Sequence, residues 1–251
     1  QAAVDFLRHD ALELPPRRFW PGPVLAEVYQ FLPEAIERYE HGRLKMTIPE
    51  RLRAQPGRVL CMYGDAGWGR EVARGKYETG RFSDALVAAA AELIQSQWQP
   101  DPPPQWVTAV PSEHHSELVQ DYARRLGAKL GLPFVAALRK SRGKQPQKQM
   151  QNSAQQLRNV LRAFHVADAP DLARPRPEAA TAGIRRVFQQ VARQVAATFG
   201  AAPVLPPVPV LLVDDMVDSG WTLTMAAVLL QRHGSGPVYP FALAKASPRG
   251  S

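Results

Sequence analysis

The chain has 251 residues, of which 45% are hydrophobic, so it is long enough for one large α/β domain, or for a domain with an extension. Its single cysteine, Cys61, excludes an internal disulfide. No apolar run approaches the roughly 20 residues that cross a bilayer, and the start lacks the pattern of a signal peptide. We therefore expect a cytoplasmic protein with no membrane partner. Because the chain begins with Gln1, we expect a piece of a longer protein.

The formal net charge of +8 comes from one region of the chain. Residues 122–167 contain no Asp or Glu and ten Lys or Arg, which leaves 21 basic and 23 acidic residues elsewhere. The ten are Arg124, Arg125, Lys129, Arg139, Lys140, Arg142, Lys144, Lys148, Arg158 and Arg162. Such a local positive field favours a polyanion, such as a pyrophosphate or a nucleic-acid backbone. The alternative is a hydrated surface with no partner.

Residues 1–57 are typical of an N-terminal extension or linker, and residues 58–251 are predicted to form the main domain. The stretch ELPPRRFWPGP is rich in proline, and short amphipathic helices are predicted at 24–32 and 34–41. From Arg58 the pattern becomes regular. The next predicted elements are a strand at 59–63, a glycine-rich turn at 64–69, a short helix at 70–77, a helix at 83–97 capped by Ser83, a strand at 106–110, a helix at 116–131 and a strand at 134–138. The last three predict a βαβ unit.

The second half of the chain contains two irregular regions. Residues 139–156 are polar and basic, which predicts a mobile loop leading into a helix around 154–161. Residues 168–207 are rich in proline and alanine around one helix-like run, which predicts a helical insertion on the surface. A strand at 208–213, a turn, a helix at 223–233 and a strand at 237–244 follow. Together the elements predict an α/β fold with an open, mainly parallel sheet flanked by helices.

The stretch VLLVDDMVDSGWT, residues 210–222, places two adjacent carboxylates after a buried strand. Open α/β sheets bind ligands at the carboxyl ends of their strands. There, Asp214 and Asp215 suit a vicinal diol, because each carboxylate accepts hydrogen bonds from hydroxyls. The following residues can surround an anion with backbone N–H groups and hydroxyls at the start of the next helix. A diol followed by a phosphate predicts a ribose 5-phosphate. The plain alternative is a turn in which Asp218 or Ser219 caps a helix.

These thirteen residues resemble the phosphoribosyl pyrophosphate signature of type I phosphoribosyltransferases. GKYETGRFSDALVAAAAELI, WVTAVPSEHH and the basic segment from Leu138 to Val166 are similar to the ComF-type subgroup. RRFWPGP, LCMYGDAGWG and VDDMVDSGWTLT together resemble the C-terminal region of certain bacterial RecQ-type DNA helicases. The resemblance implies a type I phosphoribosyltransferase-like fold that follows an N-terminal helicase module.

The resemblance also implies roles for single residues. Asp214 and Asp215 would hold the ribose hydroxyls at the catalytic centre, with Mg²⁺ reaching them through the ligand. Asp218, Ser219, Gly220, Trp221 and Thr222 would bind the 5-phosphate. Val110, Pro111 and Ser112 would form the pyrophosphate turn, and Lys140, Arg142, Lys144 and Lys148 would lie on the loop that covers the site. Glu113 and Glu117 depart from the family, which usually carries Arg there, and no hood for a nucleobase is recognisable.

Three functions remain open at this point. The chain could be a transferase that uses phosphoribosyl pyrophosphate, with an acceptor that the sequence does not name. It could bind a ribose phosphate compound, such as a nucleotide, without chemistry. It could also be a regulatory accessory of a helicase that contacts DNA through residues 122–167.

Overall fold

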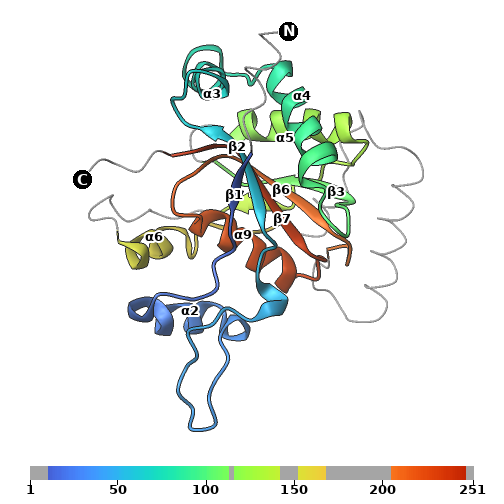
Figure 1. The fold of residues 1–251 in the computed structure, drawn as a ribbon. Coiled ribbons are helices and arrows are strands. Elements are labelled where there is room, and N and C mark those ends of the chain that lie inside the picture. The colour runs from blue at the N-terminus through green and yellow to red at the C-terminus, as the bar shows by residue number, and fades with distance from the viewer. Residues whose placement is uncertain (1–10, 113–115, 142–151, 168–204, 247–251) are drawn as a thin grey trace.

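A five-stranded sheet forms the centre of the computed structural model, which describes residues 11–112, 116–141, 152–167 and 205–246 (Figure 1). The strand order is β1-β2-β7-β6-β3. The strands are β1 (Leu12–Leu14), β2 (Gly57–Met62), β3 (Trp106–Ala109), β6 (Val210–Val217) and β7 (Val238–Lys245). Strand β1 is antiparallel to β2, and the other four strands are parallel to one another. The predicted α/β class, with a mostly parallel sheet flanked by helices, is confirmed.

Both central strands are almost completely buried, as parallel strands covered on two faces should be. Alternate residues of β6 and β7 enter two separate cores. Val210, Leu212, Val238 and Ala242 belong to the first, and Leu211, Val213, Tyr239, Phe241 and Leu243 belong to the second. We call the first the α9 core and the second the α5 core.

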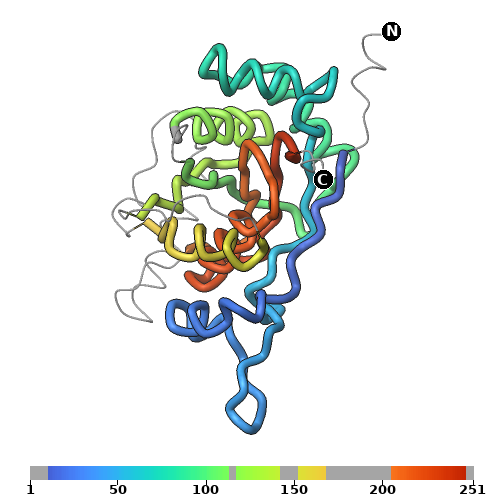
Figure 2. Tube along the Cα trace, turned by 90° about the vertical axis from the view of Figure 1, so that its left-hand side faces the viewer, coloured from blue at the N-terminus to red at the C-terminus, as the bar shows by residue number. Residues whose placement is uncertain are grey.

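Helices cover both faces of the sheet, as the two views show (Figures 1 and 2). The α5 core holds side chains of α3 (Trp68–Arg74), α4 (Asp84–Glu92) and α5 (Ser116–Leu130). The α9 core holds side chains of α2 (Leu25–Phe31), α6 (Ser153–Val160) and α9 (Trp221–Arg232). The Ser83 hydroxyl accepts a hydrogen bond from the Leu86 N–H at 3.3 Å, so the predicted cap of α4 is confirmed. Helices α3 and α4 continue into π-helical turns at Gly75–Thr79 and Leu93–Trp98.

The described part of the 1–57 extension packs onto the sheet. Strand β1 pairs with β2, and nine residues of the described part of this segment are buried in the α9 core. They are Trp20, Val24, Val28, Leu32, Ala35, Ile36, Ile48, Leu52 and Ala54. Besides α2, the helical structure within the described residues of this segment consists of single 3₁₀ turns at Gly22–Val24, Pro33–Ala35 and Glu50–Leu52.

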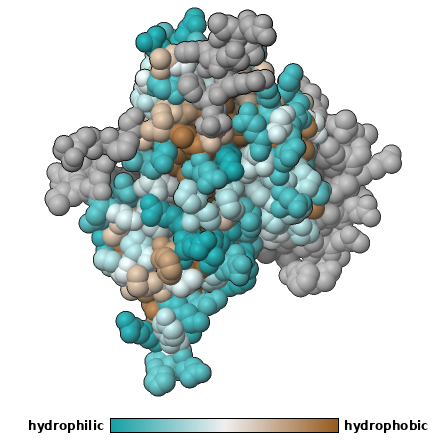
Figure 3. Space-filling view, viewed as in Figure 1, coloured by the Kyte–Doolittle hydropathy of each residue, from teal (hydrophilic) through white to brown (hydrophobic). Residues whose placement is uncertain are grey.

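The helix predicted at 34–41 is wrong. After the turn at Pro33–Ala35 the chain forms a hairpin, in which Arg38 bridges Leu44 and the Tyr39 N–H donates to the Arg43 carbonyl at 2.8 Å. Gly42 has a φ of 77°, which suits the hairpin tip and not a helix. The hairpin protrudes from the body in Figure 1, and its tip is hydrophilic in Figure 3.

A second correction concerns the strand predicted at 134–138. Phe134 makes a single parallel bridge to Val107, and the chain then leaves the main sheet. Strand β4 (Leu138–Lys140) pairs antiparallel with β5 (Phe164–Val166) in a separate two-stranded sheet. The predicted βαβ unit is therefore reduced to β3, α5 and one bridge. The two new strands pack on the α9 core, because Leu138, Phe164 and Val166 bury their side chains there.

Two further predictions concern residues that the structure does not describe. The insertion at 168–207 lies outside the described residues except for 205–207, where Leu205 is buried in the α9 core. Most of the loop predicted at 139–156 also lies outside them. Within the described residues, every helix is too short or too polar to cross a membrane.

Candidate functional site

Asp214 and Asp215 lie at a step in the edge of the sheet. Strand β3 ends at Ala109, which pairs with Val213 of β6, so β6 extends beyond β3 from Asp214 onward. On its other side β6 stays paired with β7 as far as Val217. The sequence predicted that the strand ends before the aspartates. This is wrong, because β6 continues beside β7 for four more residues, as far as Val217.

The two carboxylates are buried side by side. Each residue is 7% exposed, and the Asp215 N–H donates to Asp214 Oδ1 at 2.9 Å. Burial, together with the negative charge of Asp215, raises the pKa of Asp214 well above its ordinary value. Asp214 is therefore costly to keep ionised, which is common for acidic groups that meet a ligand.

Lys76 approaches the pair from the π-helical turn Gly75–Thr79. Its Nζ lies 2.7 Å from Asp215 Oδ2, and the two side chains are 15% and 9% exposed. Burial alone would lower the pKa of Lys76, but the Asp215 carboxylate and weaker contributions from Tyr77 and Asp214 raise it. The ammonium therefore stays charged against Asp215. We did not predict Lys76 as a site residue, although the Lys-Tyr pair in GKYETG was a signal that could have pointed to it.

Close packing around Gly75 places the Lys76 turn. A Cβ added at Gly75 would lie 2.6 Å from Phe82 Cδ1 and 3.1 Å from the Arg81 carbonyl oxygen, so only glycine allows this approach. The turn ends at Gly80, whose φ is 66°. Residues before and after the turn therefore hold Lys76 at the sheet edge.

The predicted phosphate loop follows the strand directly. Asp218 is exposed, Ser219 and Gly220 are partly exposed, and α9 begins at Trp221. Gly220 has a φ of 80°, which residues with a Cβ rarely adopt, and it has no side chain to cap the helix. The first N–H groups of a helix lack intrahelical partners, so this end of α9 suits an anion. Thr222 lies in the first turn and is partly exposed.

The Trp221 side chain has a structural place. It is 1% exposed, its ring stacks on Trp20 with centroids 6.0 Å apart, and its Nε1 donates to Ser153 Oγ at 2.9 Å. Arg17 Cζ lies 4.5 Å from the ring centroid, and Arg17 Nε donates to the Ser219 carbonyl at 2.9 Å. Among the predicted phosphate ligands, the Trp221 ring is therefore occupied by the core, and its backbone N–H donates to Ser219 Oγ at 3.5 Å. Arg17 thus contacts the backbone of the predicted phosphate loop at Ser219, a contact that the sequence did not predict.

The predicted pyrophosphate turn begins next to the aspartates. Val110 is 3% exposed and its N–H donates to the Val213 carbonyl at 2.9 Å, so the turn leaves the sheet at the level of Asp214. Pro111 and Ser112 are partly buried. Glu117 is exposed in the first turn of α5. Glu113 lies outside the described residues.

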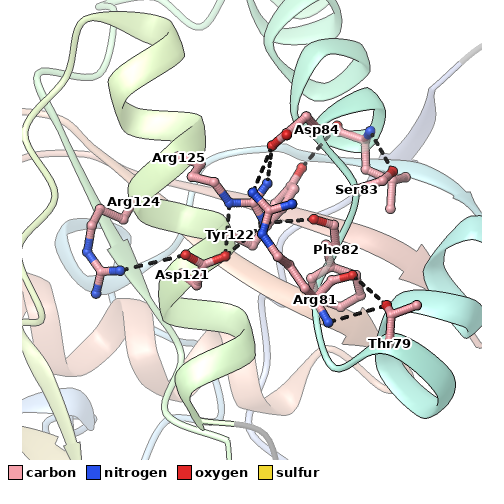
Figure 4. Close-up of polar contacts among 10 residues, drawn as sticks. Thr79, Arg81, Phe82, Ser83, Asp84, Asp121, Tyr122, Arg124 and Arg125 are labelled. Atoms are coloured by element: carbon pink, nitrogen blue, oxygen red, sulfur yellow. Dashed lines mark hydrogen bonds and ion pairs between the residues drawn. The ribbon is translucent and has the colours of Figure 1, made fainter.

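The predicted cationic loop is only partly described. Lys140 ends β4 and is partly buried, whereas Arg142, Lys144 and Lys148 lie outside the described residues. Two other cations of the 122–167 segment form ion pairs with acids far away in the sequence. Arg125 Nη1 lies 2.7 Å from Asp84 Oδ1 (Figure 4), and Arg158 Nε lies 2.8 Å from Glu27 Oε1. The positive field of this segment is therefore weaker than its sequence suggests.

The acidic groups of the described residues do not form a metal cluster. No three His, Cys, Asp or Glu side chains in the searched part of the chain come together as ligands. Asp214 and Asp215 are only two, and the ammonium of Lys76 already contacts one of them. Comparison of the chain with protein-family models and with curated protein sequences finds no match.

Proposed function

We propose that this chain binds a ribose 5-phosphate compound at the carboxyl edge of the sheet. The observation that carries the proposal is the buried pair Asp214 and Asp215, followed at once by the loop that turns at Gly220 into the N-terminus of α9. Buried carboxylates accept hydrogen bonds from hydroxyls, and helix N-terminal N–H groups bind phosphate. The two halves of the site thus match the two ends of one small ligand.

The ligand class includes phosphoribosyl pyrophosphate, ribose 5-phosphate and nucleotides. Binding is better supported than ribosyl transfer, because the exposed Glu117 would stand near the leaving pyrophosphate, where transfer requires cations. For the whole protein we propose a helicase-type DNA-processing function, with a helicase module preceding this chain. This wider proposal rests on the sequence resemblance alone.

Magnesium does not fit these residues as a resident ion. Mg²⁺ prefers six oxygen ligands in octahedral geometry. Here one carboxylate oxygen of the pair accepts the Asp215 N–H, and another contacts the Lys76 ammonium. Any Mg²⁺ would therefore arrive on the ligand, as it does with a pyrophosphate.

The alternative function, a DNA-binding accessory domain, gains no support from the described part of the basic segment. Arg125 and Arg158 are paired with Asp84 and Glu27, and Arg124 lies 3.9 Å from Asp121. Paired cations release fewer counterions from a nucleic acid than free ones.

Isothermal titration calorimetry with two matched sugars tests the proposal. Ribose 5-phosphate should bind, and 2-deoxyribose 5-phosphate, which lacks one hydroxyl of the diol, should bind about tenfold more weakly or worse, because a hydrogen bond to a charged acceptor contributes about 1.5–3 kcal/mol. The double variant Asp214→Asn with Asp215→Asn should lose binding of ribose 5-phosphate. Its control is the double variant Glu92→Gln with Asp101→Asn, which changes two exposed carboxylates. Equal affinity for the two sugars, or unchanged affinity in the aspartate variant, would refute the proposal.

A further inference from the structure

The Lys76–Asp215 contact is the unusual feature of this site. Within the described residues, Lys76 is the only basic side chain that forms an ion pair with either aspartate, and the pair is largely shielded from water. The two atoms are 2.7 Å apart, and the contact is an ion pair, because no described group near Asp215 Oδ2 meets the geometry of a hydrogen bond. A buried ion pair at this short distance limits the charge that a ligand can carry next to it.

The local charge balance decides what can bind. Two carboxylates and one ammonium leave at most one net negative charge at the diol end of the site. A divalent cation bound to Asp215 would have to displace the Lys76 ammonium or lie in contact with it. Two positive charges in contact repel each other strongly in a buried, low-dielectric environment. The ammonium therefore occupies the position that a divalent ion would need.

We propose that Lys76 replaces a divalent metal at this site, so that the aspartate pair binds the ribose hydroxyls without Mg²⁺. This inference rests on the proposed function and narrows it. Lys76 holds the Asp215 carboxylate in place and balances its charge, which leaves the remaining carboxylate oxygens free to accept hydroxyl hydrogens. The preferred ligands are then ribose compounds with a single phosphate, because a pyrophosphate on C1 carries its own Mg²⁺ toward the same region.

Packing and hydrogen bonds around the turn Gly75–Thr79 keep the Lys76 ammonium in place. Gly75 packs against the Phe82 ring, and the Phe82 carbonyl accepts a hydrogen bond from Arg125 Nη2 at 2.7 Å. The Thr79 hydroxyl donates to the Arg81 carbonyl at 2.9 Å (Figure 4). The turn that carries Lys76 is thus fixed against residues 81 and 82, which precede α4, and Phe82 is in turn bonded to Arg125 of α5. Such support suits a charge that must not move when a ligand arrives.

Titration of ribose 5-phosphate in two buffers, one with EDTA and one with millimolar Mg²⁺, tests this inference. The wild-type chain should bind with about the same Kd in both. Lys76→Gln should lose about tenfold or more of the affinity in EDTA, because the carboxylate loses its charged donor. Lys76→Arg keeps the charge and should keep metal-independent binding. Lys129→Gln, which removes an exposed lysine of α5, is the matched control and should bind as the wild type does.

The outcomes separate the two proposals. Binding by the wild type that requires Mg²⁺, or unchanged binding by Lys76→Gln in EDTA, would overturn the inference and leave the ribose phosphate site standing. No binding of ribose 5-phosphate in either buffer would overturn the proposed function, and the inference with it. If Lys76→Gln melts without cooperativity, the wild type in the two buffers and Lys76→Arg still decide the question.

Discussion

The buried carboxyl group of Asp214 lowers the stability of the fold at neutral pH. Its carboxyl group is buried next to a second carboxylate, and both effects raise its pKa well above the ordinary value. The pKa of an aspartate in the unfolded chain is about 3.9. A carboxyl group whose pKa is higher than this in the folded state makes its full contribution to stability only at pH values below about 3.9. That stabilisation is lost as the pH rises through the folded pKa. At neutral pH, Asp214 therefore does not stabilise the fold, which agrees with the ligand-binding role that we propose for it.

Asp214→Asn should accordingly make the chain more stable at pH 7. Asparagine keeps the Oδ1 acceptor for the Asp215 N–H but carries no charge to bury. The gain in the free energy of unfolding should shrink as the pH falls toward about 4, where the wild-type carboxyl group is neutral in both states. Urea unfolding at the two pH values measures this. Asp218→Asn, on the exposed loop, is the control and should change little. A variant less stable than the wild type at pH 7 would contradict this account of Asp214.

Gly220→Ala tests the loop backbone. The φ of 80° at Gly220 is unfavourable for alanine by about 1–2 kcal/mol, and an added Cβ would meet no atom within 4 Å, so the cost is conformational. The variant should lose about that much stability and also bind ribose 5-phosphate more weakly. Gly42→Ala, at a φ of 77° on the hairpin and equally free of contacts, should lose similar stability without any change in binding. If the two variants changed the affinity for ribose 5-phosphate equally, Gly220 would have no specific role in ligand binding.

At the scale of elements, Arg125 joins α5 to the start of α4. Its guanidinium donates to Asp121 Oδ2 at 2.9 Å, Asp84 Oδ1 at 2.7 Å and the Phe82 carbonyl at 2.7 Å (Figure 4). Three acceptors, on α5, on α4 and just before α4, meet one planar donor group, which is the geometry that arginine provides and lysine does not. The hydrogen bond from Arg125, followed by the charge of Arg81, lowers the pKa of Asp84.

Arg125→Met should destabilise the chain, because the Phe82 carbonyl then loses a charged donor, a loss of about 1–3 kcal/mol. Arg124→Met is the neighbouring control: Arg124 lies 3.9 Å from Asp121, so its removal should cost less than about 1 kcal/mol. The lowered pKa of Asp84 adds stability above about pH 4 that is lost as the pH falls through the folded value. The difference between wild type and Arg125→Met should therefore narrow in acid. Urea unfolding of both variants at pH 7 and pH 3 checks this, and equal losses for the two variants would contradict it.

At the scale of the whole molecule, the N-terminal segment behaves as part of the core. Trp20, Val24, Val28, Leu32 and Ile48 are fully buried against side chains of the sheet and of α9. Burial of each such side chain contributes about 1.5–3 kcal/mol, and a domain as a whole is stable by only about 5–15 kcal/mol. Loss of all five is therefore comparable with the free energy of unfolding of a whole domain.

A chain that starts at Gly57 should therefore lose its cooperative thermal transition. The control changes a short, exposed part of the same segment without touching the core: residues 39–43, at the tip of the hairpin, are replaced by two glycines. This second variant should melt as the wild type does. Differential scanning calorimetry distinguishes the two. A cooperative transition in the shortened chain would show that the segment is dispensable.

The sequence by itself determined most of the local elements and one continuous part of the candidate site. Apolar runs predicted the strands around Val59, Val107 and Val210, and Ser83 predicted the start of α4. The order of Asp214, Asp215 and Gly220 identified the candidate site, because its residues follow one another along the chain. Such features depend on contacts within a few residues, which propensity and spacing describe well.

Only the tertiary structure decided which distant residues meet. It placed Lys76 against Asp215, Arg17 against Ser219, and Asp84 and Glu27 against cations of the basic segment. It also turned residues 36–47 into a hairpin and drew the N-terminal segment into the α9 core. The physical reason is that an ion pair or a buried side chain depends on how the whole chain packs, and no local pattern of residues records which partner lies across the sheet.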